Sequence, residues 1–369
     1  MKAIRTSDVG RHGPLPTKRR SILSWVRTNI AVGRLKPGEM LPPRKWFRAK
    51  FDIADHPVQQ AFAELELEGF VRSVPGHGTH VADRLPFENR YLLLLRTRRE
   101  NAGVNLFAPA LRAATAQVES ARGISFVVRE LVDVESDSVD YAETLSEMNR
   151  QYFAGVLAQD VTLEDHGLDT FTNVNNVPIA HFGVKSVFSQ GNLCVPFGLY
   201  DREWERTEIG RHFAGLKARG CSRIAVFRSY FRGCAQRSVM EEIAKENGLE
   251  LARDGYHHMS MTEWDPHQFE RWIDLFLRSD AGRASDGIYL GDDNMLSPCV
   301  AALRRQFGSK AAERYAVSCH CNFPCPPMAA LPVEFHGPDL VAAVNGLVDF
   351  AEDCHKGLRK PRLPRLVAI

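Results

Sequence analysis

The chain has 369 residues, of which 44% are hydrophobic and 25% are charged, a composition typical of a globular protein with two or three domains. Disordered and fibrous proteins are excluded, and the longest apolar runs, such as residues 91–95, are far shorter than the roughly 20 residues of a membrane helix. Residues 1–16 are too polar for a secretory signal. The eight scattered cysteines suit buried thiols in a reducing compartment, so we expect a cytoplasmic protein.

Charge is divided unevenly along the chain. Residues 1–85 carry 15 Lys and Arg against 8 Asp and Glu, whereas residues 86–369 carry 32 against 37. Neutralising nucleic-acid phosphates requires clustered cations. The amino-terminal part is therefore the part expected to meet a polyanion.

The first half of this basic part predicts two helices with a turn between them. Residues 18–32 place apolar side chains at helical spacing, and the pair Pro37-Gly38 is typical of a type II turn because Gly tolerates the positive φ that this turn needs. Residues 44–51 fit a second, short helix, with Phe47 and Phe51 one turn apart.

A third helix follows, and then a hairpin. Asp55 is expected to cap this helix, with Pro57 in its first turn. The apolar stripe is Val58, Ala61, Phe62 and Leu65, and the outward face is His56, Gln59, Gln60, Ala63 and Glu64. Residues 70–74 and 79–81 read as strands on either side of a Gly-rich turn. Three helices and a hairpin predict a winged helix-turn-helix domain over residues 15–84.

Three motifs in this region resemble the DNA-binding domain of the GntR family of bacterial regulators. They are residues 33–42 (GRLKPGEMLP), residues 61–71 (AFAELELEGFV) and residues 76–79 (GHGT). The resemblance implies that the third helix enters the major groove, that the wing touches the minor groove, and that two copies of the chain read a palindromic DNA operator.

The chain departs from the family pattern at several contact positions. Ala54-Asp55 stand where the family has Ser-Arg or Thr-Arg, Gln59 replaces a second arginine, and Lys45, preceded by Arg44, falls on the arginine of the second-helix motif. The glutamines can pair with adenine edges or lie in solvent, and both interpretations stay open for Gln59. For Asp55, which could accept a hydrogen bond from cytosine N4, we favour the cap. The candidate DNA contacts are Arg44, Lys45, His56, Gln59, Gln60, His77 and Thr79.

From about residue 90 the chain alternates apolar strands with amphipathic helices. Strands are predicted at residues 91–95, 124–128, 155–158, 177–180, 223–228, 287–290 and 315–318, and helices at 107–122, 140–153, 204–219, 236–247, 266–278 and 297–307. This pattern predicts an α/β fold with parallel sheets covered by helices on both faces. About 280 residues are too many for one small sheet, so we expect two lobes over residues 88–369, with a ligand cleft between them.

This region resembles the LacI-type effector domain, which has the fold of type I periplasmic binding proteins. The motifs are residues 209–220 (IGRHFAGLKARG), residues 221–226 (CSRIAV), residues 292–296 (DDNML) and a closing strand at residues 358–367. The resemblance places Arg237 and Asp293 at ligand-binding positions, whereas residues 319–322 (CHCN) depart from the family's Gly-Phe-Asp-Asp.

The candidate effector contacts combine these two positions with polar and aromatic residues near strand ends. They are Arg98, Asn105, Phe107, Tyr230, Arg237, Asp293 and Asn322. A helix-end ion pair for Arg237, a helix N-cap for Asp293 and core packing for Phe107 are the structural alternatives.

Other kinds of site have weaker support. Cys319, His320, Cys321 and Cys325 offer zinc-ligand chemistry, but alternation along a strand sends His320 to the face opposite the first two cysteines, so we expect buried thiols and no metal. No catalytic or cofactor-binding motif occurs, so we expect neither enzyme activity nor a cofactor.

The combined interpretation is a ligand-responsive transcriptional regulator. We expect a homodimeric repressor that binds double-stranded operator DNA and a small-molecule effector, a sugar or sugar derivative, and that does not associate with membranes. Two alternatives remain: an α/β enzyme acting on sugars or nucleotides with an accessory winged helix, and an architectural DNA-binding protein without an effector.

Overall fold

The computed structural model describes residues 18–31, 34–96, 106–131, 153–158, 178–182, 194–197, 202–230, 236–260 and 264–355. The chain divides into two compact units between Arg90 and Tyr91. Each unit is considered by itself.

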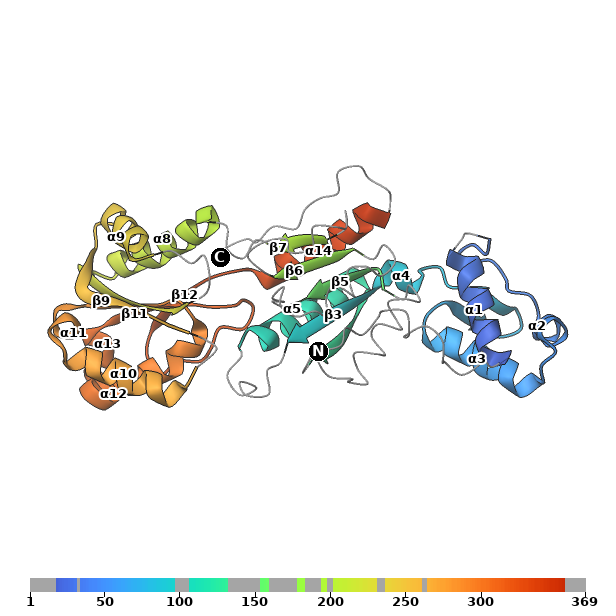
Figure 1. Ribbon diagram of the computed structural model, residues 1–369, viewed down its shortest axis with the longest axis horizontal. Coiled ribbons are helices and arrows are strands. Elements are labelled where there is room, and N and C mark those ends of the chain that lie inside the picture. The colour runs from blue at the N-terminus through green and yellow to red at the C-terminus, as the bar shows by residue number, and fades with distance from the viewer. Residues whose placement is uncertain are drawn as a thin grey trace, which may run out of the picture. The chain divides into compact units, whose positions relative to one another are not determined.

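The first unit is a small helical domain with a two-stranded wing (Figure 1). Its helices are α1 (Lys18–Ala31), α2 (Arg44–Phe51) and α3 (Asp55–Leu67), followed by β1 (Val71–Val74), β2 (Gly78–Val81) and the short α4 (Pro86–Asn89). The strands pair antiparallel, with Val71 opposite Val81. These elements confirm the predicted winged helix-turn-helix.

Aromatic rings hold the three helices together. Phe47 of α2 is fully buried, with ring centroids 5.5 Å from Trp25 of α1 and 5.1 Å from Phe62 of α3. The predicted stripe of α3, including Val58 and Leu65, is buried against this cluster. The opposite face of α3 is left to solvent, because the apolar residues recur at helical spacing on one side only.

Two local predictions in this domain have different outcomes. The turn at Pro37-Gly38 is confirmed, with Gly38 at φ +77°, the left-handed conformation that the predicted turn needs. The cap is wrong: the N-cap residue of α3 is Ala54, and Asp55 is the first residue inside the helix. One residue inside the helix, a side chain is no longer placed to accept from the free N–H groups of the first turn, so Asp55 does not cap the helix.

The second unit contains two parallel five-stranded sheets, as predicted. The first has the order β4-β3-β5-β6-β7. Its strands are β3 (Arg90–Arg96), β4 (Ser125–Leu131), β5 (Gly155–Ala158), β6 (Ile179–Phe182) and β7 (Cys194–Phe197), and α5 (Phe107–Arg122) connects β3 to β4. The predicted strand at residues 177–180 therefore begins two residues later, at Ile179.

The second sheet has the order β12-β11-β10-β8-β9. Its strands are β8 (Arg223–Tyr230), β9 (Glu250–Ser260), β10 (Gly287–Leu290), β11 (Ala316–His320) and β12 (Val333–His336). Helices on one side are α8 (Arg202–Ala218) and α9 (Arg237–Glu246), and those on the other are α10 (Pro266–Arg278), α11 (Asp280–Ala284), α12 (Leu296–Phe307) and α13 (Ala311–Arg314), with 3-10 turns at Asp293–Met295 and Gly308–Lys310.

The last described helix returns to the first sheet. α14 (Leu340–His355) follows β12 in the chain, yet it packs against α5 and β5. Leu340, Val344 and Leu347 share a buried core with Leu111 of α5. The chain therefore crosses between the two sheets after β12, and the two lobes are not consecutive in sequence.

Several elements were absent from the sequence prediction. These are α4, β7, β9, β12, α11, α13 and α14, although Leu340, Ala343, Val344 and Leu347 have the spacing that indicates a helix. The predicted helix at residues 140–153 lies almost wholly outside the described residues, and the predicted closing strand at residues 358–367 lies entirely outside them.

Candidate functional site

The outward face of α3 presents polar side chains. His56, Gln59 and Gln60 are exposed, as the helical pattern predicted. Arg44 and Lys45 are exposed in the first turn of α2, and the guanidinium of Arg44 lies 5.6 Å from the ring centre of Phe62. Amide, imidazole and cationic groups are those that read base edges and phosphates, but whether these five residues touch DNA stays a prediction.

Carboxylates of the first unit engage many of the other cations. Arg27 of α1 forms a 2.5 Å ion pair with Glu68, and Lys18 lies 3.1 Å from Asp52. On α2, Nη1 of Arg48 lies 3.7 Å from Oδ1 of Asp55. These three cations are therefore engaged within the domain. Arg44 and Lys45 are exposed at the start of α2, where they could contact phosphates.

The wing carries the last two predicted DNA contacts. His77 is exposed in the turn, where its backbone N–H donates to the carbonyl of Val74 at 2.9 Å. Thr79 is half-buried, and its carbonyl accepts a 2.8 Å hydrogen bond from the N–H of Leu41. The loop before α2 is thereby tied to the wing, and the imidazole of His77 remains at the tip. A DNA contact by His77 or Thr79 stays a prediction.

In the second unit, two of the predicted effector residues meet directly. Asp293 follows β10 and Asn322 follows β11, and Nδ2 of Asn322 donates to Oδ2 of Asp293 at 2.9 Å. Both side chains are buried. Because β10 and β11 are adjacent and parallel, their carboxyl ends bring these residues to one edge of the sheet, the edge where ligands bind in open α/β folds.

The neighbouring residues Asp292 and Asp293 have different roles. Asp292 is the N-cap of the 3-10 turn and accepts from the N–H of Asn294 at 3.0 Å, so the capping role considered for Asp293 belongs to its neighbour. Burial raises the pKa of Asp293, and the adjacent charge of Asp292 raises it further. A carboxyl of this kind, hydrogen-bonded to an amide and withdrawn from water, suits recognition of hydroxyl groups.

The segment before α5 reaches the same turn. The backbone N–H of Leu106 donates to Oδ1 of Asn294 at 3.4 Å. Phe107, the first residue of α5, is partly buried against the core of the first sheet, which matches the packing alternative. Arg98 and Asn105 lie outside the described residues, so they stay predictions.

Arg237 lies at the first residue of α9, as predicted, and is exposed. Its Nε donates to Glu241 at 2.8 Å, and its Nη2 donates to the carbonyl of Arg253 at 2.6 Å. The helix-end ion pair is therefore present. Tyr230 is the last residue of β8. Effector contacts by Arg237 and Tyr230 stay predictions.

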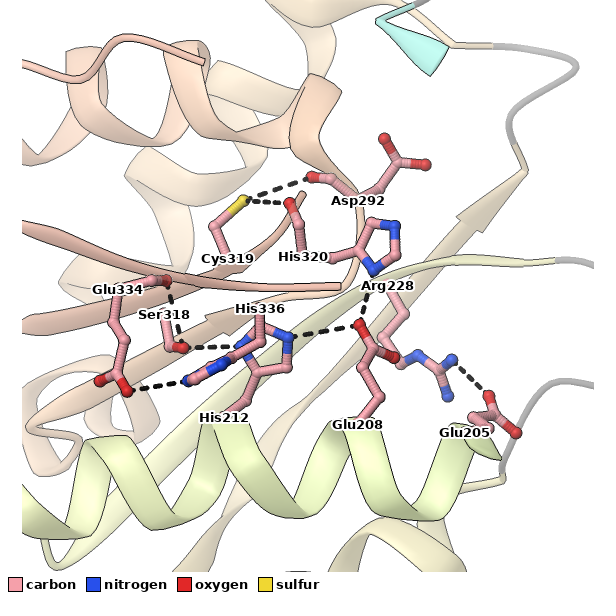
Figure 2. A network of polar contacts seen from close by, with 10 residues as sticks. All are labelled: Glu205, Glu208, His212, Arg228, Asp292, Ser318, Cys319, His320, Glu334 and His336. Carbon is pink, nitrogen blue, oxygen red and sulfur yellow. Dashed lines mark hydrogen bonds and ion pairs between the residues drawn. The ribbon is translucent and has the colours of Figure 1, made fainter. Parts of the chain in front are cut away.

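Sequence reasoning missed a buried polar network between α8 and the second sheet (Figure 2). Oε1 of Glu208 lies 2.6 Å from Nδ1 of His320 and 3.3 Å from Nε2 of His212. Nδ1 of His212 lies 2.7 Å from Oγ of Ser318. At the start of α8, Arg228 donates to Glu205 at 2.6 Å. The sequence did contain an indication of this network. Glu208 and His212 are four residues apart, so they lie on the same face of α8, beside its buried apolar residues.

Charges stabilise one another inside this network. Burial alone would raise the pKa of Glu208, but the charge of His320 and the hydrogen bonds from the two histidines hold it well below its usual range. Burial alone would lower the pKa of His320, but the charge and hydrogen bond of Glu208 raise it to about 9. Burial lowers the pKa of His212. The network is therefore an ionised Glu208–His320 pair beside a neutral His212.

The order Ser318, His212 and Glu208 has the residue types of a hydrolase triad. Both Ser318 and His212 are 0% exposed, so a substrate cannot reach the hydroxyl. His320 lies on the α8 side of β11, whereas Cys319 packs into the core on the other side, which confirms the alternation expected of a strand. Within the described ranges, no group of three or more His, Cys, Asp or Glu is arranged to hold a metal ion.

Comparison with known proteins identifies the first unit. Residues 18–81 match the family described as bacterial regulatory proteins, gntR family. The arabinose metabolism transcriptional repressor of Geobacillus stearothermophilus is 37% identical over 70 residues, which are 19% of this chain and 18% of that protein. An uncharacterised HTH-type transcriptional regulator of Rhizobium meliloti is 28% identical over 178 residues, 44% of this chain and 72% of that protein.

The fold of the rest of the chain also has a counterpart. The Lac repressor bound to ONPG in the repressed state aligns with 85% of this chain and 88% of its own length, with a TM-score of 0.54 and 14% sequence identity. Among the helices that the structure describes, none is long and apolar enough to cross a bilayer. Residues 18–81 thus match the family of bacterial regulatory proteins described as gntR, and the chain shares its fold with the Lac repressor.

Proposed function

We propose that this protein is a DNA-binding transcriptional regulator, a homodimeric repressor whose affinity for its operator changes when a sugar or sugar derivative binds to the second unit. The observation that carries the proposal is the joining of a gntR-type domain to a fold shared with the Lac repressor. Arabinose metabolism is the process regulated by the relative with 37% identity, which supports a sugar as the effector.

The polar groups at the sheet edge support the same effector class. Asp293 and Asn322 present a carboxyl and an amide at the carboxyl ends of β10 and β11. Planar groups of this kind bind pairs of hydroxyls, and a small number of them oriented toward one point is enough to position a polyol.

Regulation then follows from linkage between two binding equilibria. Dimerised second units would hold two winged helices at the spacing of a palindrome. An effector shifts DNA affinity only by its differential affinity for the two states of the protein, typically ~1–3 kcal/mol of coupling.

The test uses the full chain. Fluorescence anisotropy with duplexes from the DNA flanking its own gene should detect sequence-selective binding that weakens as salt increases. A thermal-shift panel of pentoses, hexoses and sugar acids should include a compound that raises the melting temperature and changes DNA affinity. Failure to bind any duplex at low salt would reject the regulator, and binding without any stabilising sugar would reject the effector class.

A further inference from the structure

Asp55 occupies an unusual position for an acidic residue in a DNA-binding domain. It is the first residue of α3, the helix-turn-helix element expected to enter the major groove, and its side chain is 70% exposed. The N-cap is Ala54, so the carboxylate of Asp55 is not used as the helix cap. It lies 3.7 Å from Nη1 of Arg48 on α2, itself 52% exposed.

Asp55 differs from the other two carboxylates of α3 in its surroundings. The helix sequence, DHPVQQAFAELEL, contains three carboxylates and no Lys or Arg. The domain itself engages the other two carboxylates: Glu64 pairs with Arg19 and Arg27, and Glu66 accepts from the backbone N–H of Ser73 at 2.7 Å. Asp55 is therefore the α3 carboxylate that stands at the amino-terminal end of the helix and faces solvent beside a cation of α2.

Two physical effects act on a carboxylate at this place. The first residues of a recognition helix approach base edges, where a carboxylate accepts a hydrogen bond from the amino group of cytosine. The same negative charge repels phosphates, so it weakens binding to every DNA sequence that does not supply that donor. Arg48, on the neighbouring helix, lies close enough to offset part of the repulsion.

We propose that Asp55 is a specificity-determining residue that reads a cytosine amino group in each half-site and lowers the affinity of the domain for other DNA. This inference rests on the proposed function as a DNA-binding regulator. It assigns the phosphate contacts to cations outside α3, such as Arg44 and Lys45, and the base readout to the outward face of α3.

A purely structural role for Asp55 predicts something different. An acidic residue in the first turn stabilises a helix through the helix dipole. Replacing it would then change the melting temperature of the domain slightly and leave the preferred DNA sequence unaltered.

The experiment is selection of bound duplexes from a randomised pool by the full-length wild type, Asp55→Asn and Asp55→Ala. The wild type should enrich a palindrome with cytosine at one position of each half-site, and both variants should lose that preference. They should also bind non-selected duplex roughly ten-fold more tightly, because the repulsion is removed. Asp52→Asn is the matched control, since Asp52 is an exposed carboxylate that pairs with Lys18 and lies before α3.

The outcomes separate this inference from the proposed function. If the wild type enriches no sequence, the proposed DNA-binding function fails. If the wild type and both Asp55 variants enrich the same motif, the function stands and the role assigned to Asp55 is wrong. If Asp52→Asn changes the preference as much as Asp55→Asn, the effect belongs to net charge rather than to readout by Asp55, and the inference is again wrong.

Discussion

Nδ1 of His320 lies 2.6 Å from Oε1 of Glu208, and this partly buried contact joins the end of β11 to the middle of α8. His320 precedes Asn322 by two residues, and Asn322 binds Asp293 in the candidate effector site. The charges of Asp292 and Asp293 also raise the pKa of His320. The protonated His320 therefore interacts with Glu208 of α8 on one side and with the charges of Asp292 and Asp293, at the edge of the sheet, on the other.

The first prediction concerns pH. Because the pKa of His320 in the folded protein is raised from 6.5 to about 9, protonation of this residue stabilises the fold fully below pH 6.5, and that stabilisation is lost as pH rises toward 9. His320→Gln should lower the free energy of unfolding by roughly 1–3 kcal/mol at pH 6. It should also remove the part of the fall in stability between pH 6.5 and 9 that deprotonation of His320 causes.

Urea unfolding of the full chain between pH 6 and 10 measures this effect. His267→Gln is the control, because His267 is exposed on α10 and outside the network. Wild type and His320→Gln profiles that remain parallel over this interval would show that folding does not raise the pKa of His320.

The second prediction concerns the cations at the start of α2. Lys45→Ala should weaken binding to all duplexes similarly and reduce the slope of log K against log salt by about 0.9 for each half-site, the value for one lost phosphate contact per protomer. Arg44→Ala should behave in the same direction. Anisotropy titrations at several salt concentrations provide the measurement. Lys310→Ala, which removes an exposed charge from the second unit, should leave the slope unchanged.

The third prediction tests the effector residues. Arg237→Ala should abolish the thermal shift caused by whichever sugar stabilises the wild type, while DNA binding persists. The loss of the exposed ion pair with Glu241 should itself cost only about 0.3–0.5 kcal/mol, so the variant should remain folded. Asp293→Asn, which keeps the shape of the side chain, should weaken the same response. A full thermal shift in Arg237→Ala would exclude that residue from the site.

The fourth prediction concerns the close approach of the backbone at Gly337 to the backbone next to Asn322 of the candidate effector site. A Cβ at Gly337 would overlap the carbonyl oxygen of Cys321, next to Asn322. Gly337→Ala should therefore destabilise the second unit by about 1–3 kcal/mol, because the two backbone segments must separate. Gly210→Ala is the control with the opposite expected effect. A Cβ at Gly210 would meet nothing within 4 Å, and Ala in place of Gly in helix α8 should raise the free energy of unfolding by roughly 0.5–1 kcal/mol. Thermal unfolding distinguishes the two; equal stability of Gly337→Ala and wild type would contradict the predicted overlap.

The winged helix could be predicted almost completely from sequence. Val58, Phe62 and Leu65 recur at helical spacing, and Gly38 marks a turn that needs positive φ, so the information is local. The cap at Asp55 failed by one residue, because the start of a helix depends on backbone conformation that composition does not specify.

The second unit was predicted less completely. Apolar runs identified most of its strands, and the parallel fold followed from their alternation with helices. The return of α14 to the first sheet was not predicted, because the order of strands and the partner of a helix are set by long-range packing. The contact between Asp293 and Asn322 likewise depends on β10 and β11 being neighbours.

Sequence alone therefore determined the winged helix, most strands of the two sheets and the residue types at the edge of the second sheet, since helical and strand periodicity and turn chemistry act over a few residues. Tertiary structure decided which distant side chains meet. Glu208 and His320 stand on α8 and β11, far apart in the chain. Only the packing of that helix on that sheet buries Glu208, leaves His320 partly buried beside it and makes each the counter-charge of the other.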